Sequence, residues 1–152
     1  MVATPYDEKN IQANDVIIRR ISLKEHVVRD DNKNCCRISS KAYQVSSGVA
    51  GGMSVDIESL IIKDKKDPKK FVTAPPFTGS VSFLAKQIRA IGLWVGYDPI
   101  QNNPQGSSNP YHGQVWQKKS AQSRSSHFTR GQQKQLRNAA QWYVSINGVE
   151  TK

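Results

Sequence analysis

The chain has 152 residues and carries 22 Lys and Arg against 12 Asp and Glu, a formal charge of +10 at pH 7. This length suits one compact domain. No run approaches the roughly 20 apolar residues that cross a bilayer, which excludes a membrane-spanning helix, and the composition also excludes a collagen, a coiled coil and a disulfide scaffold.

The N-terminal part of the chain predicts short strands. Residues 1–14 are polar, contain no apolar signal segment and are expected to form a flexible leader. Residues 15–22 are rich in Val and Ile and predict a strand, although two arginines interrupt it. A second short strand is expected over residues 25–29, ended by turn-forming residues 30–34.

The middle of the chain predicts two helices. Residues 53–63 predict a short helix and residues 80–91 a longer one, because their apolar side chains recur at helical spacing. Ser80 is expected to cap the longer helix, and Gly92 follows its end, where a left-handed residue is favoured. The next residues, 93–97, predict a strand.

The C-terminal part predicts one strand and a last helix. Residues 111–117 alternate as in a strand. Thr129 and Gln132 have the spacing of a capping box, and the helix that they begin is expected to bury a stripe ending at Tyr143. The elements together predict an α+β fold, a small antiparallel or mixed sheet with two main helices packed on it, in a single domain over residues 15–148. Mobile loops are expected near residues 46–52, 101–110 and 118–127.

The positive charge is concentrated in the C-terminal third. Glu150 is the only acidic residue after Asp98, whereas six basic residues lie between Pro99 and Val149: Lys118, Lys119, Arg124, Arg130, Lys134 and Arg137. An unopposed cationic field attracts polyanions, of which nucleic acid is the commonest. We therefore expect these six residues to contact the phosphates of nucleic acid or of a nucleotide.

Two aromatic residues of the same third are candidates for stacking on a base. Tyr111 and Trp116 lie in the predicted strand 111–117, close to the basic residues. Strand alternation places them on opposite faces, so we expect only one of them to be buried.

The sequence motifs of most enzyme classes are missing. There is no G-x-x-x-x-G-K-[ST] loop, no H-E-x-x-H and no G-x-S-x-G. A metal-independent RNA-cleaving toxin or a nucleotide-acting enzyme remains an alternative, with His112 as acid or base and Arg20, Arg37 and Ser39 around the scissile group. Another alternative is an interaction subunit of a defence or regulatory assembly that docks on an acidic protein.

Neither a metal nor a cofactor is expected. Carboxylates are too sparse for a two-metal nuclease, and the adjacent Cys35 and Cys36 lack the further ligands that a tetrahedral zinc site needs. Free thiols and the missing signal segment predict a cytoplasmic protein, without a membrane partner.

Five short motifs are spread along the chain: Arg19-Arg20-Ile21, Arg37-Ile38-Ser39-Ser40, Asp98-Pro99, Asn103-Pro104 and His112. In this order they resemble a set of small bacterial proteins with an Arg-rich first strand, an R-x-S-S step and a late D-P…N-P…H stretch. No activity is known for that set, so the resemblance implies an origin in a bacterium or a bacterial virus but no function. It also implies that five side chains converge: Arg20, Arg37, Ser39, Ser40 and His112.

Overall fold

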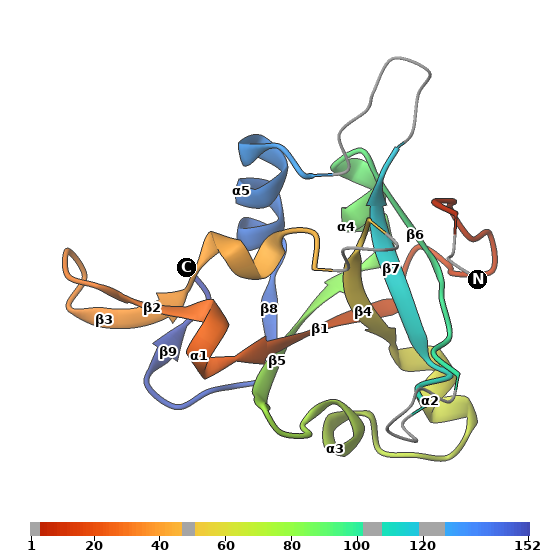
Figure 1. Cartoon of the computed structure of the whole chain (residues 1–152), viewed down its shortest axis with the longest axis horizontal. Coiled ribbons are helices and arrows are strands. Elements are labelled where there is room, and N and C mark those ends of the chain that lie inside the picture. Colours follow the sequence, from red (N-terminus) through yellow and green to blue (C-terminus); the bar gives the residue numbers. More distant parts are fainter. Residues whose placement is uncertain (1–3, 47–50, 102–107, 119–126) are drawn as a thin grey trace.

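The computed structural model describes residues 4–46, 51–101, 108–118 and 127–152, and it confirms the α+β class (Figure 1). Its larger sheet has six strands, and all neighbouring strands are antiparallel. In spatial order these are β6 (Leu93–Tyr97), β7 (His112–Gln117), β4 (Met53–Ile57), β1 (Val16–Ser22), β5 (Phe77–Leu84) and β8 (Gln141–Val144).

A smaller sheet and six helical segments complete the described part of the chain. The sheet joins β2 (Val27–Asp30), β3 (Cys35–Ile38) and β9 (Val149–Glu150), with β3 and β9 parallel. The helical segments are α1 (Leu23–His26), the 3₁₀ helix η1 (Ser40–Tyr43), α2 (Glu58–Lys63), α3 (Pro68–Val72), α4 (Ala85–Ala90) and α5 (Arg130–Ala139). Within the described ranges, no helix combines the length and the apolar character needed to cross a membrane.

The strands predicted over residues 15–22, 93–97 and 111–117 are confirmed as β1, β6 and β7. The capping box that begins α5 is also confirmed: the Thr129 hydroxyl accepts from the Gln132 amide at 3.1 Å, and the Gln132 side chain accepts from the Thr129 amide at 2.9 Å. Gly92 has a φ of +91°, the left-handed conformation expected after a helix.

The helix predicted over residues 80–91 is wrong in its first half. β5 continues to Leu84 and α4 begins only at Ala85, so Ser80 caps no helix and instead lies between β1 and β8. The segment 53–63 divides in the same way, into β4 and α2. A strand that is buried on both faces has no clean alternation, so its apolar residues also satisfy helical spacing over a few positions.

Two further boundaries differ from the predicted ones. The predicted strand 25–29 begins only at Val27, because α1 occupies the residues before it. The last helix ends at Ala139, and Tyr143 lies in β8. In each case hydrogen bonding to another strand, β3 or β5, overrides the local pattern.

The N-terminal segment, expected to be a flexible leader, packs against the domain from Tyr6 onward. Ile11 is only 1% exposed and belongs to the main core. The Asp7 carboxylate accepts from Arg89 Nε at 3.1 Å, and the Glu8 amide donates to the Val95 carbonyl at 2.9 Å. These contacts fix the segment on α4 and β6, which the polar composition of residues 1–14 did not indicate.

The central feature of the larger sheet is the separation of β1 from β4. β1 pairs with β5 along its whole length, but it pairs with β4 only at Ile17–Ile57 and Ile18–Asp56. Beyond these pairs the two strands diverge, as Figure 1 shows. The side chains and backbone groups of the two diverging strands therefore face an opening in the sheet.

Candidate functional site

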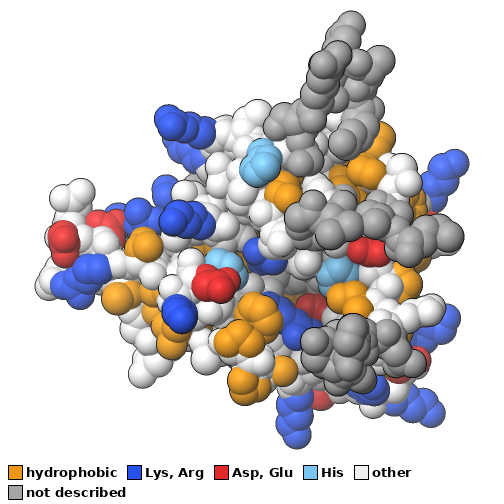
Figure 2. Space-filling model, viewed as in Figure 1, with side chains coloured by type: hydrophobic (Ala, Val, Ile, Leu, Met, Phe, Trp, Pro, Cys, Tyr) orange, Lys and Arg blue, Asp and Glu red, His pale blue; other side chains and the backbone are white. Residues whose placement is uncertain are grey.

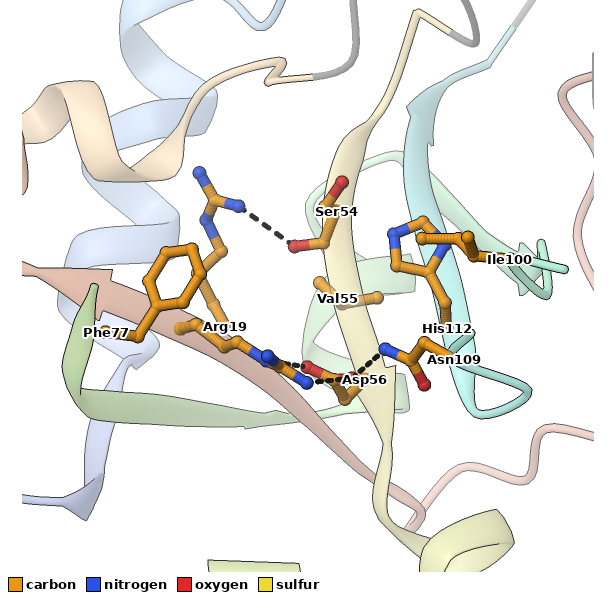
Figure 3. A pocket seen from close by; sticks show the side chains of 9 residues that line it. Arg19, Ser54, Val55, Asp56, Phe77, Ile100, Asn109 and His112 are labelled. Atoms are coloured by element: carbon orange, nitrogen blue, oxygen red, sulfur yellow. Dashed lines mark hydrogen bonds and ion pairs between the residues drawn. The ribbon is translucent and has the colours of Figure 1, made fainter. Parts of the chain in front are cut away.

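A cleft of about 210 Å³ lies where β1 and β4 separate. Figure 3 shows Arg19 on one side of it, Asp56 at its floor and His112 on the opposite side, with Ser54 and Val55 of β4 behind. In Figure 2, basic side chains in the centre of the same face lie between two histidines. We call this opening the β1–β4 cleft.

Arg20 and Asp56 form the floor of the β1–β4 cleft. Arg20 donates from Nε to Asp56 Oδ2 at 2.8 Å and from Nη2 to Oδ1 at 3.1 Å. Asn109 Nδ2 donates to the same Oδ1 at 2.8 Å. The Arg20 guanidinium also lies 5.4 Å from the ring centre of Phe71 and 5.8 Å from that of Phe77. The two hydrogen bonds between Arg20 and Asp56 link β1 to β4, and the Asn109 hydrogen bond adds the segment before β7 to the floor of the cleft.

Arg19 is a buried cation beside the cleft. It is 6% exposed, and its guanidinium donates to the carbonyls of Ala42 (Nε, 2.9 Å) and Ser54 (Nη1, 3.0 Å). Burial lowers the pKa of Arg19 to about 10, so it stays charged at neutral pH. No carboxylate in the described part of the chain forms an ion pair with it. The Ser54 carbonyl has lost its strand partner because β1 and β4 diverge, and Arg19 replaces that partner.

His112 faces the cleft in a defined orientation. It is 7% exposed, and its Nδ1 lies 2.7 Å from the Asp98 carbonyl oxygen. Because a carbonyl only accepts, Nδ1 carries the proton in the neutral ring, which leaves Nε2 as a hydrogen-bond acceptor. Figure 3 shows the ring directed from β7 toward Ser54 and Val55, so this acceptor faces the cleft.

The predicted cluster of catalytic residues assembles only in part. Arg20 and His112 line the same cleft. Arg37, however, bonds Asp30 at 2.9 Å on the smaller sheet, and the Ser39 hydroxyl accepts from the Lys41 amide at 3.2 Å at the start of η1. The expectation that these four residues and Ser40 all converge is therefore wrong. The strand carrying Arg37 belongs to a different sheet from β1, and Ser40 lines a hollow beside α5.

Arg19 does not belong to the predicted cluster of Arg20, Arg37, Ser39 and His112. The sequence signal for it is the Arg19-Arg20 pair inside an otherwise apolar strand. Consecutive strand residues point in opposite directions, so a strand buried on both faces must accommodate one cation inside the protein. That cation is Arg19.

A second hollow, of about 320 Å³, lies between α5 and η1. We call its lining the α5 face, which consists of Ser40, Arg130, Gln133, Lys134 and Arg137. The three cations follow one another at i, i+4 and i+7, so they share one side of the helix. Among the described residues no carboxylate pairs with any of them. Gln133 Nε2 donates to the Ser40 carbonyl at 3.0 Å and holds α5 against η1.

Two buried polar atoms lie behind the α5 face. Neither Arg137 Nε nor the Tyr43 hydroxyl has a hydrogen-bond partner within the described ranges. Burial raises the pKa of the Tyr43 hydroxyl, while the nearby charges of Arg137 and Arg19 oppose that rise. Tyr43 therefore lies within the electrostatic reach of both the α5 face and the β1–β4 cleft.

The remaining predicted binding residues have different positions. Lys118 is exposed at the end of β7, whereas Lys119 and Arg124 lie outside the described residues. Tyr111 and Trp116 are 3% and 0% exposed, so neither offers a ring for stacking.

The expectation that only one of these two aromatic residues is buried is wrong because both faces of the sheet are covered near β7. Tyr111 meets Phe71 edge-on, with ring centres 5.1 Å apart, and Trp116 lies 5.7 Å from Tyr6 of the N-terminal segment.

Within the described part of the chain no three His, Cys, Asp or Glu side chains are grouped to hold a metal ion. Comparison of the chain with protein-family models, with curated proteins and with solved structures finds no match.

Proposed function

We propose that the protein binds nucleic acid through the α5 face. The observation that carries this proposal is the row of Arg130, Lys134 and Arg137 on one side of α5, bordering a hollow without an opposing carboxylate among the described residues. Like charges at i, i+4 repel each other. A phosphate bound between these cations removes the repulsion, and an arginine side chain offers two parallel N–H donors to the phosphate oxygens.

The neighbouring basic residues extend this proposal. Lys118 at the end of β7 is exposed, and Lys119 and Arg124 belong to the same acid-free third of the sequence. Contacts of this kind are made to the backbone of the nucleic acid, so binding is expected to depend on salt more than on base sequence.

The test measures the fluorescence anisotropy of labelled single-stranded RNA, single-stranded DNA and duplex DNA. If three phosphates are contacted, log Kd rises with log salt with a slope of about 2 to 3. The double variant Arg130→Glu, Lys134→Glu is expected to weaken binding to every probe at least tenfold, because each phosphate contact becomes a repulsion.

The matched control is Lys63→Glu, Lys86→Glu, which changes the net charge equally at exposed positions on α2 and α4. This control variant is expected to retain most of the wild-type affinity for each probe. No binding at low salt, or an equal loss in both double variants, would show that the α5 face is not the binding surface. If an acidic protein binds the chain and none of the nucleic-acid probes does, the α5 face is likewise not a nucleic-acid-binding surface.

A further inference from the structure

The β1–β4 cleft has unused hydrogen-bonding groups on two sides. Arg19 has five N–H donors, and the described residues accept from Nε and Nη1 but not from Nη2. Arg20 uses Nε and Nη2 on Asp56, and no described residue accepts from its Nη1. Opposite these donors, His112 presents Nε2 as an acceptor.

The charges of the cleft favour an anion. The charges of Arg20 and Asp56 neutralise each other, and the Asp56 carboxylate already accepts hydrogen bonds from Arg20 and Asn109. Arg19 is left as a buried positive charge that forms no ion pair with a described carboxylate, and the more distant charges of Asp56 and Glu25 stabilise it only in part. A buried charge without a partner is unfavourable, so an anion that enters the cleft would be stabilised by the same charge.

Two apolar side chains line the cleft on opposite sides (Figure 3). Phe77 of β5 lies on the side of Arg19 and is half-buried, and Ile100 lies beside His112 and is 38% exposed. The aromatic ring of Phe77 is a surface on which a planar base can stack, independently of base identity. At about 210 Å³ the cleft is smaller than most pockets for drug-sized molecules, which start near 300 Å³, so a single nucleotide fits better than a dinucleotide.

We propose that the β1–β4 cleft binds a nucleoside monophosphate. The phosphate contacts the side of the cleft that Arg19 and Arg20 line, a ribose hydroxyl donates to His112 Nε2, and the base stacks on Phe77. This site is separate from the α5 face, and the proposal does not depend on nucleic-acid binding there.

The experiment titrates the full chain with adenosine 5′-monophosphate, adenosine and inorganic phosphate by isothermal titration calorimetry. The monophosphate is expected to bind at least tenfold more tightly than either fragment, because only it contacts both the arginines and Phe77. No heat up to millimolar monophosphate, or equal affinity for all three probes, overturns the proposal.

Two variants that spare the buried arginines locate the ligand. His112→Asn keeps a donor toward the Asp98 carbonyl, but its shorter side chain has no acceptor at the position of Nε2. It is expected to weaken monophosphate binding about tenfold, the effect of losing one hydrogen bond to a polar ligand. Phe77→Leu is expected to weaken the monophosphate similarly and to leave phosphate binding unchanged. Thermal unfolding of each variant verifies that it is folded.

The controls separate this site from the α5 face. His127→Asn, at an exposed position before α5, and Arg130→Glu, Lys134→Glu are both expected to keep monophosphate binding. If the two cleft variants bind the monophosphate as the wild type does, or if only the α5 double variant loses it, the ligand is not in the cleft and the proposal is wrong.

Discussion

The guanidinium of Arg20 and the carboxylate of Asp56 meet at the point where β1 and β4 part, with Nε 2.8 Å from Oδ2. Only 19% of the Arg20 side chain and 4% of the Asp56 side chain are exposed. The pair therefore joins the two strands at the end of their short ladder, next to the last paired residues Ile18 and Asp56, and it fixes the floor of the β1–β4 cleft.

The first prediction concerns this pair. Asp56→Ala leaves a largely buried guanidinium without its partner and is expected to lower the free energy of unfolding by about 3 kcal/mol. Asp31→Ala, which removes the exposed partner of Arg29, is expected to change it little. Urea unfolding of both variants measures the difference. Equal stabilities would mean that Arg20 is solvated well enough without Asp56.

The second prediction concerns the N-terminal segment. Ile11→Ala removes a core side chain that is 1% exposed, and it is expected to destabilise the protein by about 2 to 4 kcal/mol. Leu23→Ala, at a position that is 48% exposed, provides the control and is expected to have little effect. A wild-type unfolding midpoint for Ile11→Ala would indicate that residues 4–14 detach from the domain in solution.

The third prediction concerns two glycines with opposite roles. A Cβ at Gly113 would lie 2.6 Å from the Gly96 carbonyl oxygen of the neighbouring strand, so Gly113→Ala is expected to separate β6 from β7 and to cost about 2 kcal/mol or more. Gly131 lies in the first turn of α5, and its nearest neighbour would be 3.8 Å away. Gly131→Ala is expected to raise stability by up to about 1 kcal/mol. If the melting temperatures of Gly113→Ala and Gly131→Ala shift in the same direction, the two glycines do not have these different roles.

The fourth prediction concerns pH. Burial, with a smaller effect from the charge of Arg19, lowers the pKa of His26 to about 4, and His26 Nδ1 accepts from the Ser22 amide at 2.9 Å. The unfolded chain takes up this proton near the ordinary pKa of about 6.5. Between these values the unfolded state binds more protons, so stability falls as the pH decreases from about 6.5 to 4.

His26→Asn tests this interpretation, because its amide oxygen can accept from Ser22 without titrating. Urea midpoints measured between pH 7.5 and pH 4.5 are expected to fall less steeply for this variant than for the wild type. Parallel curves for the two proteins would assign the pH dependence to other groups.

The binding residues were predictable to different degrees. The α5 face follows from sequence because Arg130, Lys134 and Arg137 lie on one helix, where spacing alone sets which side chains are neighbours. The β1–β4 cleft does not follow in this way. Its groups come from five separate segments, and no local pattern shows that β1 is bordered by β4 and β5.

The amino-acid sequence by itself determined the α+β class, the strands β1, β6 and β7, the capped start of α5 and the cationic character of the C-terminal third. These depend on spacing, capping and charge within short stretches of chain. Only the tertiary structure decided that β5 extends to Leu84, that Tyr111 and Trp116 are buried, and that Arg20 shares a cleft with His112 but not with Arg37. Those outcomes depend on which strands become neighbours and on what covers each face of the sheet, and pairing between distant segments sets both.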